Sequence, residues 1–180
     1  MTEEEQRQAV KVEAERLAVD ALYSEKGHFA ASSRWRRSHL WLGVPAATLA
    51  ASAGAAFISD WFPVWVPALC AFVAAAITSV STFLKPDDIS KQHHNSGVDY
   101  GALRRQVRIF ANVKTNLQSI SPDKLQEELE GITASINSIQ KGSRAIPRFA
   151  FRIAASEIER GTADYAKSEV EAAIGKADET

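Results

Sequence analysis

Six of the seven hydroxyl side chains within or at the end of two apolar runs are spaced so that they follow the turn of a helix. The three in the first run fall within about 40° of one another on a helical wheel, and the three in the second are spaced i, i+3 and i+4. Such faces can line a narrow aqueous path, or the hydroxyls can bond carbonyls four residues earlier and join neighbouring helices. Both interpretations stay open. The candidate pore-lining residues are Thr48, Ser52, Ser59, Thr78, Ser81 and Thr82.

Two groups of titratable residues could do other chemistry. His93 and His94, with Asp87 and Asp88 nearby, offer metal-ligand types, but their spacing matches no recognised site, and a solvated loop is the simpler interpretation. His39 lies beside the first apolar run. Its ordinary pKa of about 6.5 would let it respond to pH, whereas a plain role at a membrane interface needs no such response.

A basic segment near the C-terminus is a further candidate. Its cations could meet anionic lipid or a nucleotide phosphate, although a solvated basic face is the simpler interpretation. The segment interleaves Lys141, Arg144, Arg148 and Arg152 with Phe149 and Phe151.

Nothing in the sequence places a reaction. No paired carboxylates, nucleophile motif, phosphate-binding glycine loop or metal signature is present, and the single cysteine, Cys70, lies within the second apolar run. We therefore expect a protein that is not an enzyme and holds no cofactor or metal. The net charge of −1 gives no general reason to expect direct nucleic-acid binding.

The two apolar runs predict a transmembrane hairpin. Leu40 to Ile58 and Val64 to Leu84 contain no charged residue, and as helices they reach about 28 and about 32 Å, against roughly 30 Å of bilayer hydrocarbon. A buried hairpin in a soluble core is the competing interpretation. It is disfavoured because a soluble helix of this length needs a polar face.

The flanking residues predict the orientation of the hairpin. Lys and Arg precede the first run and follow the second, while the connecting loop has neither, so the positive-inside rule places both termini in the cytoplasm. Tryptophans at the ends of the runs, among them Trp41, suit the headgroup region. The predicted membrane-interface residues are Arg34, Trp35, Arg36, Arg37, His39, Trp61, Trp65 and Lys85.

Small residues repeat every four positions in both runs, which permits close helix approach in lipid. One such face could hold the hairpin together and another could hold a second subunit. A pore would require subunits, because two spans cannot enclose one. The candidate helix-packing residues are Ala46, Ala50, Gly54, Ala71, Ala75 and Ser79.

The rest of the chain is predicted to be helical, which makes the protein all-α. Residues 1–39 are expected as a cytoplasmic helix with a capping box at Thr2 and a bend near Gly27, residues 40–84 as the hairpin, and residues 85–180 as a cytoplasmic helical region. In the last part we expect a polar joining stretch through Gly97, then a helix that carries apolar residues to Ile120 and, after an N-cap at Ser121, two further helices.

One of these helices carries a heptad seam. Leu125, Leu129, Ile132, Ile136 and Ile139 are spaced four, three, four and three residues apart. Two heptads are too few to indicate a coiled coil, so packing within the chain and contact between subunits both remain open. The last helix is expected from about Arg148 through Ile153, Ile158, Tyr165 and Val170.

Several of these segments resemble the SLATT family of bacterial two-helix membrane proteins. The resemblance covers roughly residues 5 to 170. It rests on Tyr23, Lys26, His28 and Phe29, on the segment from Trp35 to Pro45 and its two alanine-rich runs, on His94, Tyr100, Leu103 and Arg104, and on Ala145, Ile146 and Pro147.

The resemblance implies a role in bacterial conflict systems. SLATT proteins occur beside nucleotide-second-messenger synthetases, nucleotide-sensing SLOG domains or reverse transcriptases, and are thought to act as pore-forming antiphage effectors that disable the infected cell by abortive infection. It therefore implies a multi-pass protein of the bacterial inner membrane, acting as a homo-oligomer and triggered by a partner or nucleotide signal. A membrane-anchored adaptor that recruits cytoplasmic proteins is the alternative.

Overall fold

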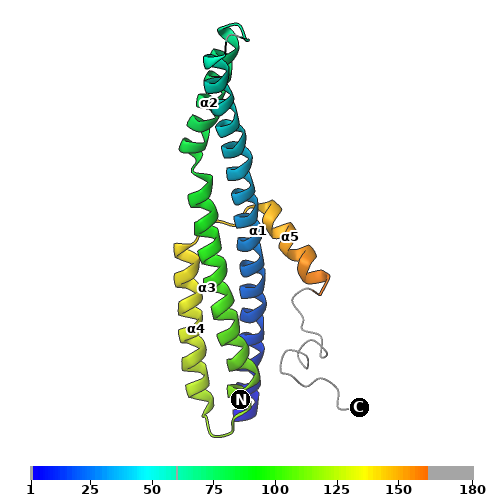
Figure 1. Ribbon diagram of the computed structural model, residues 1–180. Coiled ribbons are helices and arrows are strands. Elements are labelled where there is room, and N and C mark those ends of the chain that lie inside the picture. The colour runs from blue at the N-terminus through cyan, green and yellow to red at the C-terminus, as the bar shows by residue number, and fades with distance from the viewer. Residues whose placement is uncertain (1, 60, 162–180) are drawn as a thin grey trace, which may run out of the picture.

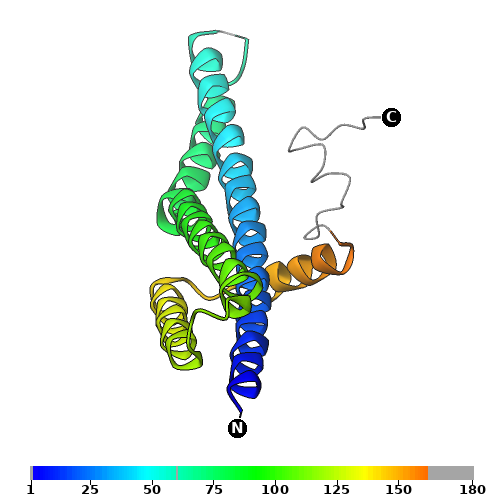
Figure 2. The same ribbon diagram turned by 90° about the horizontal axis from the view of Figure 1, so that it is seen from below.

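The computed structural model describes residues 2–59 and 61–161, and every regular element among them is helical. The molecule is elongated, with α1 running its whole length (Figure 1). In two views α4 and α5 lie on opposite sides of the α1–α3 pair (Figure 2). The elements are α1 (Glu3–Ile58), α2 (Trp65–Leu84), α3 (Pro86–Asn112), a short 3-10 helix η1 (Lys114–Asn116), α4 (Pro122–Gly142) and α5 (Arg148–Glu159).

Helix α1 is a single helix of 56 residues. It begins with the predicted capping box, in which Thr2 Oγ1 accepts from the Glu5 backbone N–H and Glu5 accepts from that of Thr2. It continues without interruption through Gly27, so the expected bend is wrong. Gly27 serves close packing instead, because a Cβ there would lie 3.0 Å from Ile146 Cγ2.

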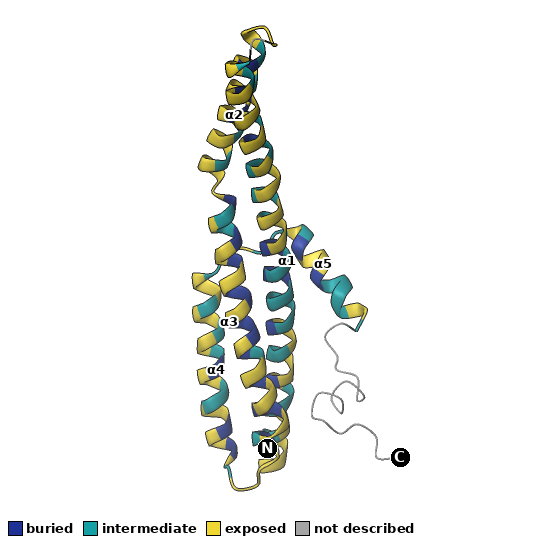
Figure 3. Cartoon of the chain, in the orientation of Figure 1, coloured by how far each residue is buried: buried dark blue, intermediate teal, exposed yellow. Residues whose placement is uncertain are grey.

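The upper part of α1, from Leu40 to Ile58, and α2 form an apolar hairpin. Two helices, α1 and the one that starts at Trp65, are long and apolar enough to cross a membrane. Only 11% of the most apolar window of each is buried, and the hairpin is largely exposed (Figure 3). These side chains therefore do not form a core within the chain, which removes the main support for a soluble, buried hairpin.

Helix α2 ends where the sequence predicts a break, but the segment that follows differs from expectation. Lys85 adopts a left-handed conformation with φ 47° and ends α2, and Pro86 starts α3 directly. The expected polar joining stretch through Gly97 is helical. Gly97 explains part of the difference, since a Cβ there would lie 3.0 Å from two atoms of the Phe29 ring. The glycine marks a close approach of α1 and α3 rather than a loop.

Below the hairpin, α1, α3 and α4 form a helical stalk with its own core. Fully buried side chains at its centre include Val107 and Phe110 of α3 and Leu125 and Ile132 of α4. The remaining members of the heptad seam, Leu129, Ile136 and Ile139, pack against this core. The heptad seam therefore packs within the chain, which is one of the two interpretations left open by the sequence.

The connection from α3 to α4 is tied to the N-terminus. Helix α3 ends at Asn112, earlier than the predicted end at Ile120. The Arg7 guanidinium donates to the carbonyls of Thr115 and Leu117 at 3.1 Å and to that of Ile120 at 2.7 Å. The N-cap position of Ser121 is confirmed, but its side chain makes no capping hydrogen bond.

Helix α5 begins at Arg148, as predicted, and packs against α1 through Tyr23, whose ring stacks on Phe151 with centroids 5.7 Å apart. The later residues expected in this helix, Tyr165 and Val170, lie outside the described residues.

Candidate functional site

The hydroxyls predicted to line a pore are not gathered on one path in the single chain. Thr48 donates to the Val44 carbonyl at 2.9 Å, and Thr78 to that of Ala74 at 2.8 Å. Ser59 donates to the carbonyl of Ala56 at 3.3 Å. Among the six candidates, only Thr78 lines the groove between α1 and α2, while Thr48, Ser52 and Thr82 are exposed and Ser81 is half-buried.

That groove collects the small residues. It has a volume of about 760 Å³. Five of the six candidate packing residues line it, and the sixth, Ala46, is buried. Around Gly54 the two helices do not approach closely, since no atom lies within 4 Å of an added Cβ. The lining comprises Ala50, Ala53, Gly54, Phe57, Val64, Pro67, Ala68, Ala71, Ala74, Ala75, Thr78 and Ser79.

The predicted interface residues fall at both ends of the hairpin. At the tip, Trp61 and Trp65 are 90% and 66% exposed. At the base, Arg36 and Arg37 are exposed and Lys85 forms the joint between α2 and α3. The others at the base are Trp35 and His39, both half-buried, and Arg34, whose guanidinium carbon lies 5.2 Å from the centroid of the Phe149 ring.

Three of the four residues considered for a metal site contact different partners. Asp87 pairs with Lys91 at 2.6 Å, and this hydrogen bond lowers the pKa of the Asp87 carboxyl. His94 packs on the ring of Phe29 with centroids 5.6 Å apart. His93 is buried, so the solvated-loop interpretation is wrong for it. Within residues 2–59 and 61–161, no group of three or more His, Cys, Asp or Glu is placed to hold a metal ion.

His93 belongs to a polar cluster that the sequence analysis missed. Just below the hairpin, where α1 and α3 cross, buried polar side chains face one another from the two helices. We call this cluster the polar neck. It consists of His28 and Ser32 of α1 and Ser90, His93, Ser96 and Tyr100 of α3, all 2–8% exposed.

At the centre of the polar neck the two histidines share a hydrogen bond. His28 Nδ1 and His93 Nδ1 are 2.9 Å apart, so one ring donates its Nδ1–H and the other accepts. The Tyr100 ring stacks on His28 with centroids 5.5 Å apart. The Tyr100 hydroxyl forms a hydrogen bond with Ser24, and burial raises the pKa of the tyrosine.

The surroundings of both imidazoles favour their neutral forms. Burial, with a smaller effect of His93, lowers the pKa of His28 to about 4. Burial and the positive charge of Arg144 lower the pKa of His93. Because burial disfavours the charged form, the neck holds a neutral pair at neutral pH.

Serine pairs flank the histidines on either side. Towards the hairpin, Ser32 Oγ and Ser90 Oγ are 3.2 Å apart, and Ser90 also donates to the Ser32 carbonyl at 3.0 Å. Away from it, Ser143 donates to Ser96 Oγ at 2.9 Å. A sequence signal exists for this arrangement: His28 and Ser32 are four residues apart and so share a helix face.

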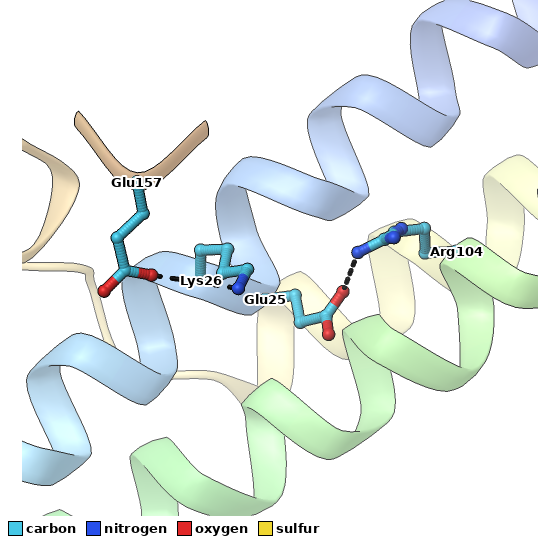
Figure 4. Close-up of polar contacts among 4 residues, drawn as sticks. All are labelled: Glu25, Lys26, Arg104 and Glu157. Atoms are coloured by element: carbon cyan, nitrogen blue, oxygen red, sulfur yellow. Dashed lines mark hydrogen bonds and ion pairs between the residues drawn. The ribbon is translucent and has the colours of Figure 1, made fainter. Parts of the chain in front are cut away.

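Two ion pairs hold the stalk at the level of the polar neck (Figure 4). Arg104 Nη1 of α3 lies 2.9 Å from Glu25 Oε2 of α1. Lys26 Nζ, the next residue on α1, lies 3.8 Å from Glu157 Oε2 of α5. Two consecutive residues of α1 therefore bind two different helices: Glu25 pairs with α3 and Lys26 with α5.

The cations of the basic segment do not lie together on one surface. Arg144 donates to Gln92 Oε1 of α3 at 2.7 Å, whereas Lys141 is exposed at the end of α4. Arg152 lies in a different place, a groove of about 520 Å³ between α1 and α5. That groove is lined by Arg34, Phe149, Arg152, Ile153, Ser156, Glu157 and Arg160.

The structure thus joins an apolar hairpin to a helical stalk through a buried polar neck. Comparisons of the chain with family models, with curated proteins and with solved structures find no match.

Proposed function

We propose that this protein is a bacterial inner-membrane effector of an antiphage conflict system. Its hairpin crosses the membrane twice with both termini in the cytoplasm, and homo-oligomers of it open a pore when a partner or nucleotide signal triggers them. The resemblance to the SLATT family supports the biological setting, in which the trigger comes from a genomically linked nucleotide synthetase, SLOG-type sensor or reverse transcriptase.

The observation that carries the membrane part is the exposed apolar surface of the hairpin. Phe57, Phe72 and Phe83 are 77%, 73% and 87% exposed. In water, such a surface would cost about 25 cal/mol for each Å² left unburied, whereas lipid covers it without cost. The basic residues at the base, with none described at the tip, support a cytoplasmic position of the stalk.

Continuity between stalk and hairpin supports the effector part. Helix α1 passes from the stalk to the tip without a break, and only the one-residue joint at Lys85 separates α2 from α3. A movement of α1 against α3 in the stalk is therefore transmitted to both spans. A trigger bound in the cytoplasm would change the hairpin if it bound one arrangement more tightly than the other.

The pore itself requires neighbouring subunits, because two spans enclose nothing. The groove of about 760 Å³ between α1 and α2 leaves small side chains uncovered, and small residues are what helices in lipid use for close contact. In the oligomer, the hydroxyls that now bond their own helix would turn toward a shared aqueous path.

An anchored adaptor is the second candidate. The hydrogen bonds of Thr48 and Thr78 to their own helix favour it, since an anchor needs no polar path and these hydroxyls are already satisfied. In that case the stalk alone would recruit cytoplasmic partners.

Membrane potential and dye entry in bacteria distinguish the two functions. The full chain would be expressed alone, with its genomic neighbours and under phage challenge. We expect rapid depolarisation in the triggered cells, and we expect the combined Thr48→Val and Thr78→Val substitutions to abolish it at equal membrane expression, because valine keeps the shape but removes the hydroxyl.

Thr133→Val is the matched control. Thr133 donates to the Leu129 carbonyl at 2.9 Å, the same bond to its own helix, but it lies on α4 outside the hairpin. This variant should depolarise cells as the wild type does. An intact potential under every condition would overturn the pore and leave the adaptor.

A further inference from the structure

The polar neck lies just below the joint between α2 and α3, at the base of the two spans. Above the neck, α1 continues beside α2 toward the tip of the hairpin, and below it α1 and α3 run side by side in the stalk (Figure 1). His28 and His93 are each 2% exposed and meet at this crossing. The bond between them is therefore a direct link between the helices that lead into the hairpin.

We propose that the His28–His93 pair is a proton-binding switch, which holds α1 against α3 while both imidazoles are neutral and drives the two helices apart when both take up protons. The proposal concerns the stalk and does not depend on whether the hairpin forms a pore.

The geometry admits only one hydrogen between the two Nδ1 atoms. In the neutral pair, one Nδ1–H points at the lone pair of the other ring, 2.9 Å away. When both rings are protonated, every ring nitrogen carries a hydrogen and none can accept. Two N–H groups would then face each other, each on a cation, and the bond becomes a repulsion.

The groups that face the pair offer the extra charge little compensation. From α3, Tyr100 stacks on His28, and from the segment after α4, the Arg144 cation acts on His93 and disfavours its protonation. The nearest ion pairs are already made, Glu25 with Arg104 between α1 and α3, and Lys26 with Glu157 between α1 and α5. His94, one residue further along α3, packs on the Phe29 ring of α1.

Separation exposes the imidazoles to water, where their cationic forms are solvated. The serine pairs on either side would part with them, because Ser32–Ser90 and Ser96–Ser143 also join different helices or segments. Each of these bonds can be replaced by water at small net cost. Opening the neck therefore relieves the repulsion between the two imidazolium rings, and water takes the place of the hydrogen bonds that the serines lose.

The test measures the distance between α1 and α3 as pH falls. Spin labels are attached to cysteines introduced at Ser33 and Asn95, exposed positions on the two helices next to the neck, in a full-length chain with Cys70→Ala, reconstituted in lipid nanodiscs. Between about pH 7.5 and about pH 4, a range that runs from the neutral pair down to the lowered pKa of His28, we expect the distance distribution to move reversibly to values several ångström longer.

Two variants make the result specific. His28→Gln with His93→Gln keeps polar, non-titrating side chains at the neck, and its distance should not respond to pH. His94→Gln removes an exposed histidine one residue away and should respond as the wild type does. An unchanged distance in the wild type, or the same lengthening in the double glutamine variant, would overturn the proposal.

A second measurement covers the case in which the double variant no longer closes at neutral pH. Nitrogen-15 NMR of the imidazoles in the otherwise wild-type chain follows protonation directly. We expect the His28 and His93 signals to titrate together, below the ordinary histidine pKa of about 6.5. Independent titration of the two at the ordinary histidine pKa would overturn the switch.

Discussion

Arg104 of α3 donates to the Glu25 carboxylate of α1 at 2.9 Å, with side chains only 13% and 18% exposed. The pair sits against Gly101, where an added Cβ would lie 3.2 Å from Glu25 Oε1. The absence of a side chain at residue 101 thus leaves room for the carboxylate between the helices, at the level of the polar neck.

Removing Arg104 should destabilise the stalk more than removing an exposed cation. Arg104→Ala leaves Glu25 charged and mostly buried, so we expect a loss between the ~1 kcal/mol of an exposed pair and the ~3 kcal/mol of a buried one. Urea unfolding in detergent micelles, followed by circular dichroism, measures it. Lys91→Ala, which breaks the exposed pair with Asp87, is the control and should change stability less than Arg104→Ala does. Equal effects would contradict the role of burial.

Alanine at two helical glycines should have opposite effects. At Gly97 the new Cβ meets the Phe29 ring at 3.0 Å, and we expect a loss of about 1–3 kcal/mol from overpacking. At Gly131 in α4 nothing lies within 4 Å, so alanine should stabilise the helix by about 0.5–1 kcal/mol. Thermal unfolding of the two variants compares them directly; a stabilised Gly97→Ala variant would show that α1 and α3 are not in close contact there.

Arg7 should control the order of the α3–α4 connection. Arg7→Ala leaves the carbonyls of Thr115, Leu117 and Ile120 without their shared donor, and a charge-assisted bond is worth about 1.5–3 kcal/mol. We expect faster amide hydrogen exchange across residues 113–121. Arg16→Ala serves as the control, since Arg16 is exposed and pairs only locally with Glu13. Unchanged exchange in the Arg7 variant would mean that other contacts order the connection.

His28 should make the stalk lose stability in acid. Its pKa is lowered from 6.5 to about 4 in the folded chain, so the unfolded chain binds more protons between these values. The contribution of neutral His28 to the free energy of unfolding is fully present above about pH 6.5 and is lost as the pH falls toward about 4. A difference of this size corresponds to at most ~3 kcal/mol.

The carboxylates of the chain also contribute to acid unfolding, so the measurement is the difference between the wild type and His28→Gln across the pH series. The variant should show a shallower loss than the wild type over the same range. Parallel curves would show that His28 titrates equally in the folded and unfolded chains.

Much of the fold follows from local sequence. The capping box at Thr2, the break at Lys85 and the start of α5 at Arg148 depend on a few adjacent residues, and all three are confirmed. Features that depend on distant packing were predicted poorly. Gly27 and Gly97 look like a bend and a loop in sequence, but the structure uses both to bring a neighbouring side chain close to a helix backbone.

The candidate site shows the same division. Hydropathy predicted the apolar hairpin because a bilayer-length uncharged run is a property of consecutive residues. It could not predict the polar neck, since His28 and His93 lie 65 residues apart and each looks like an ordinary polar residue in its own segment. Likewise, hydroxyl spacing placed Thr48 and Thr78 on helix faces, but it could not predict that Thr78 lines the groove between α1 and α2 while Thr48 lies outside it.

The sequence by itself determined the all-helical class, the ends of helices other than α3, and the two runs that are long and apolar enough to cross a membrane, because these depend on short-range periodicity and composition. Only the tertiary structure decided which polar residues are buried, that the heptad seam of α4 packs within the chain, and that His28 meets His93. Those outcomes depend on how α1 and α3 cross, and the crossing is set by the summed packing of side chains that are far apart in the sequence.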